Sequence, residues 1–302
     1  MKEIKNILIC GLGAIGSIYV AKIKDARVLV DKDRLERYKK NPTYFNGELL
    51  NPHYILPDDN VFKADLIIIA TKSDGFEQAV ENIKNFVGEN TVILSLLNGV
   101  TSEKLLIDKY GADKVLYSYF IGHSAVRVGR HITQDGVNTI VFGSPDDNKN
   151  IERVKNYFDK KGINYDIPDD IIHSMWLKYM LNVSSNQTTA LLGYTFGQML
   201  NNERCMSFVK NVMKEVQTIA KAEGVKNTET MVDEALLSLN KMCPEGKTSM
   251  LQDVEAGRKT EVDIFAGVMI KLGKKHNIDV PYNKVLKELI EIYWNIVDYG
   301  LG

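Results

Sequence analysis

The sequence predicts an α/β domain built on a doubly wound parallel sheet, followed by an all-α domain. Two observations support this prediction. Short apolar runs alternate with helical patterns over the first half of the 302-residue chain, which is typical of strand–helix–strand units. After Pro168 no further strand pattern occurs, and helical periods continue to the end. We therefore expect two domains, residues 1–168 and residues 169–302.

The apolar runs and the helical periods locate the main elements of both domains. In the first domain we expect buried strands at residues 7–10, 27–30, 64–70, 91–97, 115–121 and 163–167, a hairpin or meander at 126–142, and a helix at 150–161. In the second domain we expect helices at residues 171–192, 203–223, 228–239, 263–275 and 282–297.

Composition and charge exclude several classes of protein. With 44% hydrophobic and 25% charged residues, the chain has the make-up of a soluble globular protein, and its net charge of -1 argues against a nucleic-acid partner. The three cysteines are far apart and match no disulfide framework or metal-ligand spacing, so no metal site is expected. We expect no signal peptide, no membrane span and a cytoplasmic location, because the first strand begins almost at once and no apolar run is long enough.

A glycine-rich stretch directly after the first strand predicts a dinucleotide site. The residues Gly11, Leu12, Gly13, Ala14, Ile15 and Gly16 form G-x-G-x-x-G between a strand and a helix. The first glycine permits a tight turn, the second lets a diphosphate approach bare backbone, and the third lets the helix pack close to the strand. The N-terminal end of that helix would hold the diphosphate. The prediction is a Rossmann domain that binds NAD(P); the alternative is merely a tight turn between strand and helix.

Residues at other strand ends extend this candidate site. Asp31 ends the second strand, where an acidic side chain can accept hydrogen bonds from an adenosine ribose. Lys32 and Arg34 follow and could instead bind a 2′-phosphate, so the choice between NAD and NADP stays open. Lys72 and Asn98 follow two further strands, and ligands bind beyond such ends. For Lys72 a solvated surface lysine is the alternative.

One helix of the second domain carries a candidate proton donor. From residue 171 to residue 202 the only fully charged side chain is Lys178, so this helix is expected to be largely buried. Asn182 and Asn186 follow at spacings of four residues and form one polar stripe with it. Burial would lower the pKa of this lysine toward the range useful for proton transfer. The alternative is a lysine whose ammonium reaches solvent.

A carboxylate partner for the lysine is expected between residues 247 and 263. Four acids lie there, and composition does not choose among them: Asp253, Glu255, Glu261 and Asp263.

With these residues in place, the chain resembles the 2-dehydropantoate 2-reductases, or ketopantoate reductases, over essentially its whole length. The resemblance rests on Gly11 to Gly16, Thr71-Lys72, Asn98-Gly99, Trp176-x-Lys178-x3-Asn182-x3-Asn186, Thr248-Ser249-Met250-Leu251-Gln252-Asp253 and Thr260-Glu261-Val262-Asp263. It implies that Lys178 is the general acid and that Glu261 binds the substrate hydroxyl and interacts with the lysine. It also implies that four residues position the substrate, the serine helping to bind its carboxylate: Asn98, Asn182, Asn186 and Ser249.

The chain departs from the family pattern at three places. The family's usual Asn-Pro after the lysine helix is Asn186-Gln187 here, and a substrate-binding asparagine of some members corresponds approximately to Phe196. The arginine that commonly binds the NADP phosphate is replaced by the run from Asp31 to Arg34, slightly out of register.

The resemblance implies NADPH-dependent reduction of 2-dehydropantoate to (R)-pantoate in pantothenate biosynthesis, with NADH as a possible cofactor. The expected partner is a small 2-keto acid, and a homodimer is possible. Two alternatives stay open at this point. One is a related dehydrogenase acting on another 2-keto or hydroxy acid, and the other is a nucleotide-binding regulator without turnover.

Overall fold

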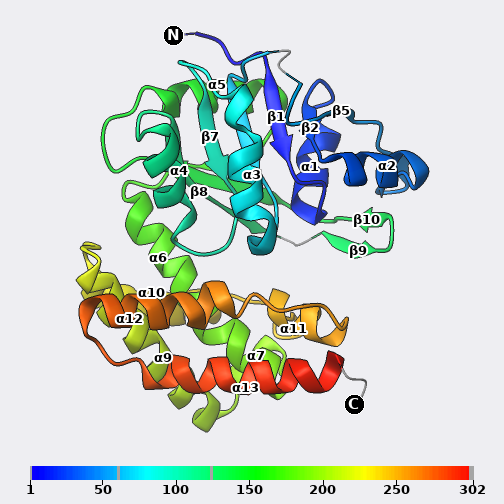
Figure 1. Ribbon diagram of the computed structural model, residues 1–302. Helices are drawn as coiled ribbons and strands as arrows, with labels where there is room; N and C mark the ends of the chain where they lie inside the picture. Colours follow the sequence, from blue (N-terminus) through cyan, green and yellow to red (C-terminus); the bar gives the residue numbers. More distant parts are fainter. Residues whose placement is uncertain (1, 60–61, 123–124, 299–302) are drawn as a thin grey trace. The chain divides into compact units, whose positions relative to one another are not determined.

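The structure is a computed structural model that describes residues 2–59, 62–122 and 125–298. The chain divides into two compact units, residues 1–171 and 172–302. In Figure 1 the first unit contains a sheet with helices packed on it, and the second contains helices. The expected boundary after Pro168 lies close to this division.

The first unit is organised by an eight-stranded sheet with the order β12-β11-β8-β7-β6-β1-β2-β5. The six strands from β5 to β8 in this order are parallel and follow the strand order of a Rossmann domain. Their bounds are β1 Ile7–Cys10, β2 Arg27–Leu29, β5 His53–Ile55, β6 Leu66–Ile69, β7 Val92–Ser95, β8 Val115–Gly122, β11 Asn138–Gly143 and β12 Tyr165–Asp166.

The large sheet is mixed, because strand β11 runs antiparallel to β8. Within residues 126–142, strands β9 (Val126–Val128) and β10 (His131–Thr133) form an antiparallel hairpin around Gly129-Arg130, as expected, whereas β11 joins the large sheet. Strand β10 also pairs with β3 (Tyr44–Phe45), which pairs with β4 (Glu48–Leu49), in a second sheet of order β4-β3-β10-β9. The difference follows from burial: β11 is almost entirely buried, whereas all of β9 is exposed.

Helices cover both faces of the large sheet because its central strands are apolar on both sides. In β1, Ile7 and Ile9 pack into one hydrophobic cluster, whereas Leu8 and Cys10 pack into another. The covering elements are α1 Ala14–Lys22, α2 Lys32–Lys40, η1 Ser73–Gly75, α3 Phe76–Asn82, η2 Lys84–Phe86, α4 Ser102–Tyr110 and α5 Asn150–Lys161.

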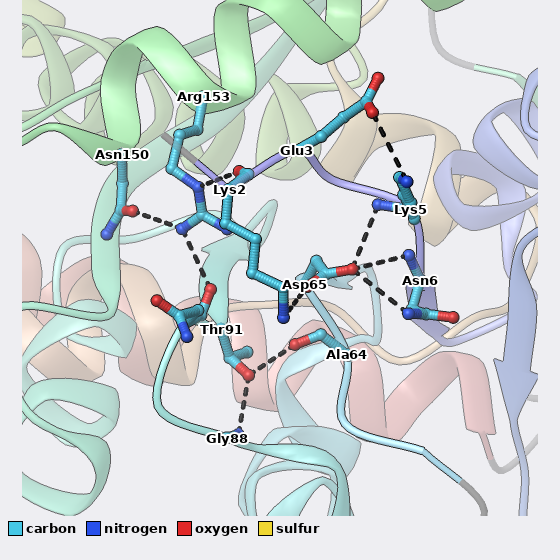
Figure 2. Close-up of polar contacts among 11 residues, drawn as sticks. Lys2, Glu3, Lys5, Asn6, Ala64, Asp65, Gly88, Thr91, Asn150 and Arg153 are labelled. Carbon is cyan, nitrogen blue, oxygen red and sulfur yellow. Dashed lines mark hydrogen bonds and ion pairs between the residues drawn. The ribbon is translucent and has the colours of Figure 1, made fainter.

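At the amino ends of β1 and β6 a polar network ties the start of the chain to the sheet (Figure 2). Asp65, 3% exposed, accepts hydrogen bonds from the backbone N–H groups of Lys5 and Asn6, at 3.2 and 3.0 Å. Its other oxygen lies 3.1 Å from the ammonium of Lys2. The guanidinium of Arg153 donates to the Lys2 carbonyl at 3.0 Å. These contacts fix the segment that leads into the first strand.

The second unit is helical throughout its described part. Its elements are α6 Ile171–Leu181, η3 Asn182–Asn186, α7 Gln187–Leu192, α8 Phe196–Leu200, α9 Glu203–Ala222, η4 Thr228–Thr230, α10 Met231–Leu239, α11 Ser249–Glu255, η5 Asp263–Gly267, α12 Val268–His276 and α13 Pro281–Asp298. The five expected helices are present. The sequence prediction missed α8 and α11, because helices of five and seven residues are too short for a periodic pattern.

Two of the expected helices contain a π-helical segment, η3 within residues 171–192 and η5 at the start of residues 263–275. Segments of this kind are rare and occur frequently at functional sites. Among the described residues, no helix combines the length and the apolar character that crossing a membrane requires.

Candidate active site

The glycine-rich loop has the geometry that its spacing predicts. Gly11 adopts a φ of +103°, and a Cβ atom there would lie 2.6 Å from the Ala70 carbonyl oxygen. A Cβ atom at Gly16 would lie 2.0 Å from the Gly11 carbonyl oxygen, so α1 packs directly against the loop. A Cβ atom at Gly13 would meet nothing within 4 Å. The space beside Gly13, at the N-cap of α1, is therefore open, as the diphosphate prediction requires.

An arginine that the sequence analysis missed contacts this loop. Arg127, on β9, donates a hydrogen bond from Nη1 to the Leu12 carbonyl at 3.1 Å, and its Nε donates to Gly129 at 3.0 Å. The guanidinium thus adds a positive charge beside the loop. No sequence pattern could reveal this contact, because the two residues lie 115 positions apart.

At the end of β2, Asp31 and Arg34 contact each other. Asp31 is the N-cap of α2: its Oδ1 accepts from the Arg34 N–H at 2.6 Å, and its Oδ2 lies 3.2 Å from the Arg34 guanidinium. Lys32 and Arg34 are both exposed. Asp31, the candidate ribose ligand, and Arg34, a candidate ligand of a 2′-phosphate, therefore form an ion pair with each other at the surface.

Two further candidate residues follow neighbouring strands of the same sheet. Lys72 follows β6 and is exposed, and Asn98 follows β7 and is half-buried. Since β7, β6, β1 and β2 are adjacent and parallel, their carboxyl ends meet at one edge of the sheet. The sheet therefore brings these positions to the edge where the glycine-rich loop lies.

Buried serines anchor the turn that carries Asn98. The Ser95 hydroxyl donates to Ser102 Oγ at 3.0 Å, and that hydroxyl donates to Glu103 Oε2 at 3.0 Å. The Ser118 hydroxyl donates to the Ser95 carbonyl at 2.9 Å. These bonds join β7, β8 and the start of α4 on either side of the turn.

In the second unit, Lys178 lies near the end of α6 and is half-buried. All residues from 183 to 190 are buried, as the missing charges predict. Asn182 begins the π segment η3, so Lys178, Asn182 and Asn186 do not lie on one continuous α-helix. A step of four residues overshoots an α turn and falls short of the wider π turn, so the two offsets oppose each other between Lys178 and Asn186.

Asn186 contacts the start of α11. Its Nδ2 donates to the Ser249 hydroxyl at 3.3 Å, across 63 residues of sequence. One turn later, the buried Thr189 hydroxyl lies 2.7 Å from that of Thr248, the N-cap of α11. Two of the expected substrate-binding residues, Asn186 and Ser249, are thus in contact.

Three of the four candidate carboxylates form ion pairs with basic groups other than Lys178. Asp253 lies 2.6 Å from Arg258, Glu255 lies 2.6 Å from Lys247, and Asp263 lies 3.1 Å from Lys287.

The fourth, Glu261, is half-buried and lies two residues before η5, which packs against η3.

Phe196 begins α8 beside the segment that leads to Thr248. Its N–H donates to the Gly246 carbonyl at 3.0 Å, and a Cβ atom at Gly246 would lie 3.3 Å from its ring. In the described ranges no three His, Cys, Asp or Glu side chains gather as they would around a metal ion.

Comparison with known protein families identifies both halves of the chain. Residues 7–147 match the family described as "Ketopantoate reductase PanE/ApbA", and residues 170–293 match "Ketopantoate reductase PanE/ApbA C terminal". The chain belongs to the ketopantoate reductase family. It is thus an NAD(P)H-dependent oxidoreductase acting on a CH–OH or keto group, not a nucleotide-binding regulator without turnover.

Individual relatives span nearly the whole chain. A 2-dehydropantoate 2-reductase of Aquifex aeolicus is 28% identical, over 95% of this chain and 96% of its own length. A D-mandelate dehydrogenase solved with NADH and anilino(oxo)acetate superimposes with a TM-score of 0.84 at 20% identity, over 97% and 99%. A ketopantoate reductase of Staphylococcus aureus, described as dimeric, has a TM-score of 0.77 at 20% identity, over 97% and 100%. The two solved structures share the fold.

Proposed function

We propose that this enzyme reduces 2-dehydropantoate to (R)-pantoate with NADPH, a step of pantothenate biosynthesis. The observation that carries the proposal is the contact between Asn186 and Ser249, the two residues that the resemblance assigns to substrate binding. The Aquifex aeolicus relative, which covers almost the whole chain, supports the same substrate.

The residues of the glycine-rich loop suit a dinucleotide. The open side at Gly13 leaves room for a diphosphate at the start of α1, and Arg127 adds a charge beside it. The remaining cofactor contacts that we propose come from Gly11, Leu12, Ala14, Ile15, Gly16, Asp31, Lys32, Arg34, Lys72 and Asn98. When bound, the nicotinamide supplies the hydride that reduces the keto carbon.

The side chains of the second unit then supply binding and a proton. Hydride addition converts the ketone to an alkoxide, and we propose that the Lys178 ammonium donates its proton to that oxygen. Glu261 accepts a hydrogen bond from the substrate hydroxyl, while Ser249 donates to the substrate carboxylate. Asn98, Asn182 and Asn186 orient the keto acid. The balance is one hydride and one proton gained by the keto acid as NADPH is oxidised to NADP⁺.

Our proposal of NADPH over NADH rests on the basic residues after β2. The ion pair between Asp31 and Arg34 is exposed, and such pairs contribute only about 0–1 kcal/mol to stability. A 2′-phosphate can therefore take over the Arg34 guanidinium at small cost, with Lys32 next to it. NADH remains the alternative, with Asp31 accepting from the ribose.

One observation favours a second candidate substrate. Phe196 stands approximately where some family members have a substrate-binding asparagine, and its ring lies against Gly246. An aromatic ring there favours a 2-keto acid with an apolar side chain. The second candidate is therefore reduction of a 2-keto acid that lacks the hydroxyl of 2-dehydropantoate.

The test is the initial rate of NADPH and NADH oxidation with 2-dehydropantoate and with phenylglyoxylate, a 2-keto acid without that hydroxyl. Lys178→Ala should lower kcat by roughly 10²–10⁴-fold, the usual loss for a missing general acid. The control is Lys214→Ala, which removes an exposed lysine of α9 and should leave kcat unchanged.

Activity of Lys178→Ala within twofold of the wild type would remove the lysine from the mechanism. Faster turnover of phenylglyoxylate than of 2-dehydropantoate would favour the second candidate. The ratio of the two cofactor rates would decide between NADPH and NADH.

The homodimer stays a prediction. It is supported by the dimeric relative from Staphylococcus aureus and by an apolar face of α13. On that face Val285, Leu289 and Ile292 are exposed at helical spacing, at 48%, 46% and 57%.

A further inference from the structure

Gln187 occupies the position at which the ketopantoate reductase family usually has proline. It is the first residue of α7, directly after η3, and it is fully buried. Its Nε2 donates to the Val183 carbonyl at 2.7 Å, within its own helix. Its Oε1 accepts from the N–H of Ala266 at 3.3 Å, within η5. One amide side chain therefore links the two π segments, which a proline ring cannot do.

Tyr179, on α6, makes a second polar link to η5. Its hydroxyl donates to the carbonyls of Phe265 at 2.9 Å and Ile264 at 3.2 Å. Burial raises the pKa of this hydroxyl well above its ordinary value, so it remains a neutral donor. Tyr179 directly follows Lys178 in the chain.

These two links hold backbone groups of Ile264, Phe265 and Ala266, in the turn after Glu261. The Ile264 N–H donates to the Glu261 carbonyl at 3.1 Å, so the turn that starts at Glu261 ends at a peptide held by Tyr179. Ala266 and Phe265 are fully buried. A buried peptide group that loses its hydrogen-bond partner destabilises the fold, so the turn has one preferred register against α6 and η3.

We propose that Gln187 and Tyr179 are positioning residues that fix the Glu261 turn in its register against the helix of Lys178. The consequence for catalysis rests on the proposed function, in which Glu261 binds substrate and Lys178 donates the proton. We propose no contact between substrate and either of these two residues. Each acts by setting where Glu261 is held.

Hydrogen exchange on the free enzyme tests the link without any need for activity. Gln187→Leu keeps the volume and removes both hydrogen bonds, and we expect faster amide exchange over residues 260–267. The matched control is Thr188→Val. This neighbouring residue is also buried and donates to its own helix at Ser184, at 2.7 Å, without a bond to η5. Equal exchange over residues 260–267 in the two variants would overturn the proposal.

Steady-state kinetics test the consequence of this positioning for catalysis. A displacement of about 1 Å at a catalytic group can cost up to about 100-fold, so we expect kcat/KM of Gln187→Leu to fall about 10–100-fold. Tyr179→Phe should show a loss of the same kind, and Thr188→Val should stay within about twofold of the wild type. An equal loss in Gln187→Leu and Thr188→Val would overturn the positioning role.

Gln187→Glu provides a conservative rescue. A protonated carboxyl can donate to Val183 and accept from Ala266, whereas an ionised one cannot donate. Burial raises the pKa of such a carboxyl, so activity relative to the wild type should be high near pH 6 and fall as the pH rises. A relative activity that does not change with pH would count against the link. If the wild type reduces no 2-keto acid, the proposed function fails, and hydrogen exchange still decides the link.

Discussion

The two ends of strands β1 and β6 differ in what their polar groups contact. At the carboxyl end, the glycine-rich loop leaves the backbone around Gly13 open. At the amino end, the Asp65 carboxylate and the Arg153 guanidinium are turned inward and bound to other parts of the chain (Figure 2). The amino end thus uses its polar groups for the fold, whereas the carboxyl end carries the loop that we propose binds the cofactor. Substitutions at the two ends should therefore separate stability from binding.

The largest expected effect is at the amino end. Asp65→Ala removes the acceptor of two backbone N–H groups, those of Lys5 and Asn6, and should lower the free energy of unfolding by about 2–4 kcal/mol. Lys2 adds little because its side chain is 63% exposed. Urea unfolding followed by circular dichroism measures the loss.

The control is Asp108→Ala, an exposed member of an i,i+4 pair with Lys104, which should change stability by less than about 0.5 kcal/mol. The Kd for NADPH should be unchanged in Asp65→Ala. A weaker NADPH affinity in this variant would break the proposed separation between the two ends.

The next effect is at the carboxyl end. Gly13→Ala places a methyl group where the fold has open space, so stability should stay within about 1 kcal/mol of the wild type. The methyl group occupies the proposed diphosphate position, and the Kd for NADPH should rise about 10-fold or more. Quenching of protein fluorescence on titration with NADPH measures it.

Gly16→Ala is the contrasting control, because its methyl group would lie 2.0 Å from the Gly11 carbonyl oxygen. It should lower both stability and affinity. An unchanged affinity in Gly13→Ala would place the diphosphate elsewhere.

The smallest effect is a pH dependence at the amino end. Burial alone would raise the pKa of the Asp65 carboxyl, but hydrogen bonds from Asn6 and Lys5 and the charge of Lys2 lower it below its ordinary value. A lowered folded-state pKa stabilises the fold above the unfolded value of about 4, and this contribution is lost as the pH falls through the folded value. The stability difference between the wild type and Asp65→Asn should therefore shrink below about pH 4. A difference that stays constant would show that the charged form is not favoured by folding.

Local patterns determined most of the fold and of the candidate site. The strand, three glycines and helix around Gly11 could be predicted from the sequence because their order and spacing are a local pattern typical of a dinucleotide-binding turn. The burial of the helix around Lys178 was also predicted from a local pattern, the absence of other charged side chains. Both patterns depend on neighbours in the chain, and the structure contains both.

Only the tertiary structure decided the features that depend on distant residues. The partner strand of β11, the π segments at Asn182 and Asp263, and the contact of Arg127 with Leu12 have no local signature. The same holds for Gln187. The sequence shows that it replaces the proline usual in the family, but it does not show that its side chain accepts a hydrogen bond from Ala266. Such contacts are chosen by which buried groups need a partner once the chain is packed, and that need arises only between segments far apart in sequence.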